Sequence, residues 1–143
     1  NTITCTCPKL IKHPFIKYLG ITIDQHLKWN NHIEYIIVNL RQLTYFFIIT
    51  KKILNKQLIR TTYFAMAQSL IEYSIIAWGG CNATLKCNLS IRQKNLIKII
   101  LNKQKTFPSS ELYKMLRVLD IDNLYKKQAI CFIFKNNLFN IKK

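Results

Sequence analysis

The sequence predicts an α+β fold that is mostly α, in which a short β-hairpin at the amino end precedes a bundle of four to five helices. Two residue patterns lead to this prediction. Residues 2–7 and 15–23 are strand-like and rich in β-branched side chains, so we expect them to pair as antiparallel strands. After residue 30, apolar residues recur instead at helical spacing. The length of 143 residues suits one ordinary domain.

A glycine interrupts the second strand-like stretch. Gly20 stands in the middle of the run YLGITID, and we expect it to lie inside the strand. Glycine within a strand typically marks a bulge, a tight bend or the close approach of another backbone. The chain has only three glycines, so one of these roles is expected here.

The first helix is expected to run from residue 31 to a point between residues 50 and 55. Asn30 or Asn31 is a natural N-cap, and Glu34 follows Asn31 at the interval of a capping box. Trp29 and Trp78 are interpreted as core anchors at the two ends of the first helical pair. The apolar residues that define the helix are Ile33, Ile36, Ile37, Leu40, Leu43 and Phe47.

Two further long helices are expected to follow. The first begins near Lys56 and runs to Trp78, where Gly79 and Gly80 stop it. The second covers about residues 83–103.

The chain is predicted to end in two more helices. Ser109 or Ser110 can cap a short one that ends near Val118, and Asp122 can cap the last one. The last helix is expected to pack through Leu124, Ala129, Phe132 and Ile133. No linker or repeat separates these parts, which we assign to residues 1–29, 30–80 and 81–143.

The charge of the chain is strongly unbalanced. Lys and Arg number 22 against 6 Asp and Glu, which gives a formal net charge of +16. Such a chain favours an acidic partner, and nucleic acid is the preferred prediction. The alternative is a solvated basic surface, because the Lys, Ile and Asn in which the chain is rich all have AT-rich codons.

The cysteines indicate an intracellular protein with reduced, mostly buried thiols. Cys5, Cys7, Cys81, Cys87 and Cys131 lack the paired spacing of a structural zinc site. No signal peptide is visible, and the apolar runs are too short to span a membrane. The chain begins at an asparagine, so we expect it to be a piece of a longer protein.

No catalytic residue, metal ligand or cofactor site is predicted within this chain. The carboxylates are few and scattered, so the paired aspartates of a two-metal site are not expected to form. His13, His26 and His32 are interpreted as surface or capping residues, because no nucleophile accompanies them. For Trp29, stacking on a base is the alternative to a core position.

Basic residues gather in three places, and clusters of this kind are typical of phosphate contacts. They lie around the hairpin, around the start of the second helix and along the third helix. The alternative for each is a solvated face without a ligand. The residues predicted to bind nucleic acid are Lys17, Tyr18, Leu19, Gly20, Lys28, Trp29, Lys51, Lys52, Arg60, Arg92, Lys94 and Lys98.

The order of several motifs resembles a known family. The stretch KYLGITIDQHLKWNNHI resembles the region after the catalytic aspartates in reverse transcriptases of non-LTR (LINE-type, jockey-like) retrotransposons. SLIEYSIIAWGG, RQKNLIKII and LDIDNLYKKQAICFIFK are similar to later motifs of the same enzymes, in the same order. Ser74 departs from the pattern, since many relatives have glycine there.

The resemblance implies that the chain holds an RNA–DNA or DNA primer-template duplex. Residues 1–29 would form the palm edge with the primer grip, in which Tyr18, Leu19 and Gly20 approach the primer end. Residues 30–80 would form the thumb, and residues 81–143 a helical connection.

The same resemblance implies that the parent polymerase uses Mg²⁺ held by aspartates. The chain begins after the motifs that carry them and lacks the fingers and most of the palm, so polymerisation by this part alone is not expected. The alternative is a stand-alone basic helical module that binds nucleic acid or protein without polymerase chemistry.

Overall fold

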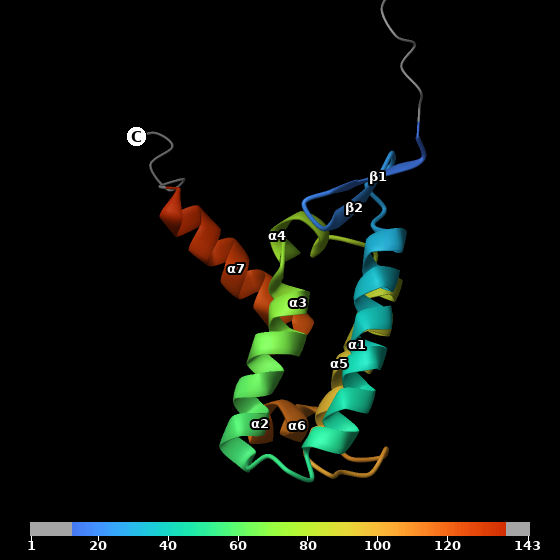
Figure 1. Ribbon diagram of the computed structural model, residues 1–143. Coiled ribbons are helices and arrows are strands. Elements are labelled where there is room, and N and C mark those ends of the chain that lie inside the picture. Colours follow the sequence, from blue (N-terminus) through green and yellow to red (C-terminus); the bar gives the residue numbers. More distant parts are fainter. Residues whose placement is uncertain (1–12, 137–143) are drawn as a thin grey trace, which may run out of the picture.

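The structure, a computed structural model, describes residues 13–136 and confirms the predicted α+β, mostly α fold (Figure 1). A two-stranded hairpin stands at one end of a set of packed helices. The elements are β1 (Phe15–Tyr18), β2 (Ile21–Asp24), α1 (Asn30–Thr50), α2 (Lys56–Thr62), the π-helical segment η1 (Tyr63–Gln68), α3 (Ser69–Glu72), α4 (Ile75–Trp78), α5 (Ala83–Ile100), α6 (Ser109–Leu116) and α7 (Ile121–Lys135).

The hairpin is tighter than predicted. Strands β1 and β2 pair antiparallel with Tyr18 opposite Ile21, so Leu19 and Gly20 form a two-residue turn. Both have positive φ, 46° and 81°. A two-residue turn of this kind matches the twist of the strands only with positive φ at both positions, which glycine adopts readily. The prediction that Gly20 lies inside a strand is therefore wrong. The strand predicted for residues 2–7 lies outside the described residues.

An aspartate, rather than an asparagine, organises the entry to α1. The carboxylate of Asp24 accepts backbone N–H bonds from His26, Lys28 and Trp29, at 3.1, 3.0 and 2.7 Å. The bond from Lys28 makes the largest contribution to lowering the pKa of Asp24, and the bonds from Trp29 and His26 lower it further. The N-cap position is occupied by Trp29, which makes no side-chain cap. The predicted Asn30 or Asn31 cap is therefore wrong, because Asp24 reaches across the turn instead.

The predicted second helix is interrupted. It continues from α2 through η1 and α3, but Tyr73 and Ser74 break it before the short α4, with Ser74 at φ 54°. The indole N–H of Trp78 donates to the carbonyl of Tyr73 at 3.0 Å, which satisfies a backbone group that the break leaves free. Gly79 ends α4 as predicted, and a Cβ there would collide with the ring of Tyr125 from α7.

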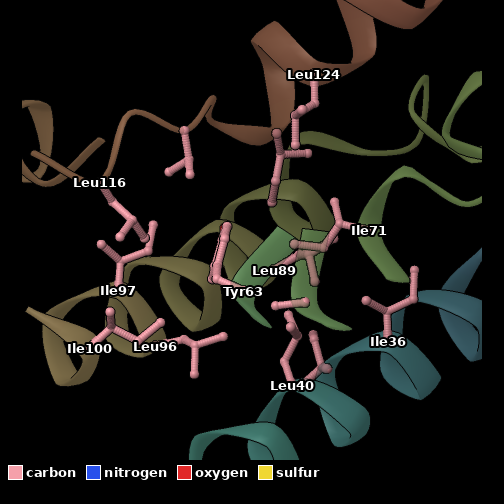
Figure 2. Close-up of a cluster of buried hydrophobic side chains, with 14 of the residues drawn as sticks. Ile36, Leu40, Tyr63, Ile71, Leu89, Leu96, Ile97, Ile100, Leu116 and Leu124 are labelled. Carbon is pink, nitrogen blue, oxygen red and sulfur yellow. The ribbon is translucent and has the colours of Figure 1, made fainter. Parts of the chain in front are cut away.

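The core lies where α1 and α5 pack against each other and against η1, α3 and α6. Figure 2 shows side chains from these elements converging, among them Ile36, Leu40, Tyr63, Leu96 and Ile97. All five are at most 1% exposed. This burial removes from water the helical stripe that the sequence predicts, and it is the main stabilising contribution to the fold.

A buried amide joins three parts of this core. The side-chain nitrogen of Gln93 donates to the hydroxyl of Tyr63 and to the carbonyl of Leu119, each at 3.0 Å. Its oxygen accepts from the hydroxyl of Tyr113 at 3.2 Å. Burial raises the pKa of Tyr113 to about 12 and that of Tyr63 further, so both hydroxyls stay protonated. Because each partner is satisfied, the network fixes α5 against η1 and α6.

The carboxyl-terminal helices differ in detail from the prediction. Helix α5 ends at Ile100, and α6 begins after Pro108 without a serine cap. The side chain of Asp120, not of Asp122, caps α7 by accepting from the N–H of Asn123 at 2.8 Å.

Helix α7 also packs over a shorter length than predicted. Within it only Ile121 and Leu124 are buried, while Phe132 is 46% exposed. The far half of the helix projects away from the other helices, so the packing expected through Phe132 is wrong (Figure 1).

The described cysteines are more accessible than predicted. Cys81 is half-buried, whereas Cys87 and Cys131 are exposed, because both lie on helix faces turned away from the core. Cys5 and Cys7 lie outside the described residues. None of the helices in residues 13–136 has the length and apolar character needed to cross a bilayer.

Candidate functional site

Ten cationic residues line two grooves, one at the end of the molecule opposite the hairpin and one along its side, and no carboxylate lines either groove. The end groove, about 1160 Å³, lies where the α1–α2 loop, the end of α5 and the end of α6 meet. The side groove, about 660 Å³, runs between α1 and α5. The ten residues are Arg41, Lys51, Lys52, Lys56, Arg60, Arg92, Lys98, Lys103, Lys105 and Arg117.

Two cations of the end groove hold the ends of helices. The ammonium of Lys51 donates to the carbonyl of Ile99 at 3.2 Å and to the side-chain oxygen of Asn102 at 2.8 Å. The guanidinium of Arg60 donates to the carbonyls of Leu116 and Arg117, at 2.9 and 3.3 Å. Carbonyls at a helix C-terminus lack intrahelical donors, so both cations stabilise the fold by donating to them. Both cations also contribute to the positive potential of the groove.

A third cation has a similar role in the side groove. The ammonium of Lys98, in α5, donates to the backbone carbonyl of Lys105 and so ties the following loop to the helix. The loop is held in a second way by Lys103, whose ammonium lies 4.7 Å from the ring centroid of Phe107. These contacts place the cationic loop along the open side of the groove.

The remaining cations are available to a ligand. Within the described residues, Lys52, Lys56, Arg92, Lys105 and Arg117 have no side-chain hydrogen bond and no ion pair. A sixth, Arg41, lies 3.9 Å from Glu34, but both side chains are more than half exposed, so this pair is weak. Dense positive charge without a counter-charge attracts anions.

The structure does not bring the predicted site residues together. Lys17, Tyr18, Leu19, Gly20 and Lys28 belong to the hairpin and the loop after it, and all are exposed. The end groove lies at the opposite end of α1, whose 21 residues at 1.5 Å per residue span about 30 Å. The side groove begins about half-way along α1, at Leu40 and Arg41.

Trp29 is a core anchor, as is Trp78. It is half-buried and packs against the core, and its ring centroid lies 6.2 Å from that of His32 in an edge-on arrangement. Trp78 is fully buried, with its ring 6.3 Å from His32 on another side. The core interpretation of both tryptophans is therefore confirmed.

The interpretation of His32 as a surface or capping residue is wrong. Its side chain is 2% exposed, and its Nδ1 accepts the N–H of Thr22 at 3.5 Å. Burial lowers the pKa of His32, and its Nε2 has no hydrogen-bond partner. The helical spacing did carry a signal for this position, since His32 lies four positions before Ile36 on the buried face of α1. The packing of β2 and Trp78 over the start of α1 completes the burial of the ring.

The sequence prediction and the grooves overlap in part. Lys51, Lys52, Arg60, Arg92 and Lys98 line a groove, whereas Lys94 is half-buried on α5 and lines neither. The groove residues that the prediction left out are Arg41, Lys56, Lys103, Lys105 and Arg117. Spacing along the chain could indicate Lys56 and Lys105, but Arg117 joins the end groove only through the packing of α6.

Comparisons of the chain with protein-family models, with curated proteins and with solved structures found no match.

Proposed function

We propose that this chain is a C-terminal part of an RNA-directed DNA polymerase of the non-LTR retrotransposon type and that it holds the primer-template duplex. The ordered motifs of the sequence support the polymerase assignment. The order of the elements, a hairpin followed by packed helices, agrees with the palm edge and thumb that the resemblance implies.

The side groove is the observation that carries the proposed binding role. All its charged lining residues are cations, and Arg92 and Lys105 have no acidic partner within the described residues. The amide of Asn95 lies among them. Lys and Arg with neighbouring amides are the groups that bind phosphate oxygens of a nucleic-acid backbone without reading its sequence. The groove lies between α1 and α5, the two longest helices of the described residues.

The proposed role is binding rather than chemistry. Polymerases transfer nucleotides with two metal ions held by carboxylates. Within residues 13–136, no three His, Cys, Asp or Glu side chains gather in a group that could hold a metal ion. Under the proposed assignment, the Mg²⁺ site belongs to the palm of the parent enzyme.

A salt titration tests the binding role. The chain is titrated with two fluorescein-labelled RNA–DNA hybrids of unrelated sequence, and fluorescence anisotropy gives the binding constant at several salt concentrations. Contacts with about five phosphates make log K fall against log salt with a slope of roughly −4 to −5, equal for both hybrids. A flat response, or a preference for one hybrid, contradicts the proposed role.

A second observation distinguishes the polymerase from a stand-alone basic module. If the chain belongs to a polymerase, the reading frame upstream of Asn1 encodes an aromatic-Ala-Asp-Asp motif. A frame without that motif contradicts the polymerase assignment while leaving nucleic-acid binding untouched.

A further inference from the structure

The floor of the end groove is aliphatic, which duplex binding does not require. Phosphates need cations and donors, and the side groove supplies these with only two apolar side chains, Leu40 and Ile99, in its lining. In the end groove, by contrast, Met115 is 50% exposed at the surface. The apolar residues that line it are Leu54, Ile59, Ile100, Leu101, Met115 and Leu116.

An unpaired nucleic-acid strand is a poor match for this floor. Proteins hold unpaired bases by stacking them on aromatic rings, and no aromatic residue lines the end groove. Two rings near the groove in the chain, Phe64 and Phe107, already lie beside cations. The guanidinium of Arg60 lies 4.7 Å from the ring centroid of Phe64, and the ammonium of Lys103 lies 4.7 Å from that of Phe107.

All the charged residues that line the end groove are cations. Lys51 and Arg60 are held by helix C-termini, whereas Lys52, Lys56 and Arg117 face the groove without an acidic partner in the described part of the chain. An occupant that matches both surfaces carries apolar side chains on one side and carboxylates on its flanks. An amphipathic helix with acidic flanks has this arrangement, and such helices bind grooves through apolar residues spaced by three and four positions.

The size of the groove agrees with such an occupant. Two turns of a helix about 10 Å across occupy roughly 850 Å³. The end groove, at about 1160 Å³, is of comparable volume. The unbranched, flexible side chain of Met115 lies at its surface, and methionine adapts to different apolar side chains on helix-binding surfaces.

We propose that the end groove is a docking site for an acidic amphipathic helix of a protein partner. This site adjoins the side groove, with which it shares Lys103, and it does not depend on the proposed polymerase function. Its affinity comes from burying the apolar face of the helix on the aliphatic floor. Its selectivity for acidic helices comes from the cationic rim.

The test uses two fluorescein-labelled peptides of about four turns, rich in Glu and Leu and of identical composition. In one peptide the leucines follow i, i+3, i+4 and i+7 spacing, and in the other they are spread around the helix. The probe for the competing class is a single-stranded oligo-dT. Anisotropy is expected to give the patterned peptide an affinity at least about tenfold higher than the scrambled one, a difference of about 1.4 kcal/mol.

Substitutions in the groove identify the site. Met115→Gln keeps the length of the side chain but removes its apolar end. It is therefore expected to lower the affinity for the patterned peptide about fivefold and to leave the affinity for oligo-dT unchanged. The matched control is Leu58→Gln, because Leu58 is equally exposed, at 52%, but does not line the groove. Circular dichroism verifies that both variants are folded.

Three outcomes overturn the proposal. Equal affinity for both peptides would mean that charge alone binds them, and an equal effect of Met115→Gln and Leu58→Gln would place the peptide elsewhere. If Met115→Gln lowers the affinity for oligo-dT as much as the affinity for the patterned peptide, a nucleic-acid strand is the occupant of the end groove. The hybrid titration above is independent of all three, so failure of one proposal does not decide the other.

Discussion

The hydroxyl of Tyr73 donates a hydrogen bond to the backbone carbonyl of Leu19 at 2.5 Å, which joins the break between α3 and α4 to the turn of the hairpin. The two residues are 54 positions apart in the chain. The hairpin has only two short strands and an exposed β1, so it is not stable by itself. This bond, the contact of Thr22 with His32 and the packing of β2 on α1 hold it in place.

Tyr73→Phe is expected to loosen the hairpin. The substitution removes one partly exposed hydrogen bond, so the free energy of unfolding should fall by about 1 kcal/mol. Urea denaturation followed by circular dichroism measures the change. Tyr45→Phe is the matched control, since Tyr45 is 69% exposed and its hydroxyl has no partner among the described residues. Equal stability of the two variants would mean that the bond to Leu19 contributes nothing.

Gly20→Val is expected to destabilise the protein. At φ 81° a residue with a Cβ is strained, and a β-branched one especially so, at a cost of about 1 to 2 kcal/mol. Space is not the cause, because a Cβ at Gly20 would lie 3.6 Å from the ring of Tyr73, an ordinary contact. Urea denaturation should give Gly20→Asn a clearly higher free energy of unfolding than Gly20→Val, because asparagine tolerates positive φ. Two equally stable variants would show that the turn relaxes.

The hairpin turn and Asp24 illustrate what sequence patterns can and cannot predict. The change from β-branched alternation to helical spacing predicted the class of fold, because periodicity follows directly from which face is buried. A run such as YLGITID does not reveal where a hairpin turns, since leucine, the residue at position 19, is common in strands. The role of Asp24 was missed for a similar reason. Its carboxylate caps residues up to five positions away, a reach that no short-range capping pattern contains.

The grooves were predictable only in part. Lysines and arginines near the start of α2 and along α5 were evident from local clustering. Some of these cations donate to carbonyls at helix ends, whereas others are free to bind a ligand. Which of them do so depends on tertiary contacts, such as the bonds of Lys51 to Ile99 and of Arg60 to Leu116. No pattern within a helix predicts a carbonyl 48 or 56 residues away.

The stability of the protein is expected to fall as the pH drops below 6.5, because of His32. Burial lowers the pKa of this imidazole in the folded state from its usual value of 6.5. Between the lowered value and 6.5 the unfolded chain binds more protons than the folded one, so the free energy of unfolding rises with pH in this window. The contribution is fully present above 6.5 and is lost as the imidazole becomes charged.

Urea denaturation at pH 7.5 and at pH 5.5 measures this effect, with His32→Asn as the comparison. The variant starts less stable but should show a smaller difference between the two pH values. Asp24 does not interfere, because its pKa is lowered from 3.8 and its contribution is lost only at more acid pH. An identical pH difference in the variant would assign the effect to other groups.

The double variant Arg92→Gln/Lys105→Gln is expected to weaken binding to RNA–DNA hybrids and to reduce its salt dependence. Both side chains line the side groove and have no acidic partner in the described residues. The slope of log K against log salt should become shallower by about one to two units, roughly one for each lost phosphate contact. Lys98 is a less suitable target, because its ammonium also holds the carbonyl of Lys105, and its loss would disturb the loop.

The matched control, Lys126→Gln/Lys135→Gln, removes the same charge from α7, where both lysines are exposed and line neither groove. If the side groove holds the duplex, this control keeps the parental slope, because a distant charge contributes little beyond a Debye length of about 10 Å at 0.1 M salt. Equal loss in both double variants would mean that the hybrid responds to net charge rather than to the groove. A parental slope in both would move the contact either to the hairpin, where Lys17 and Lys28 are exposed, or to the end groove around Lys51 and Lys52.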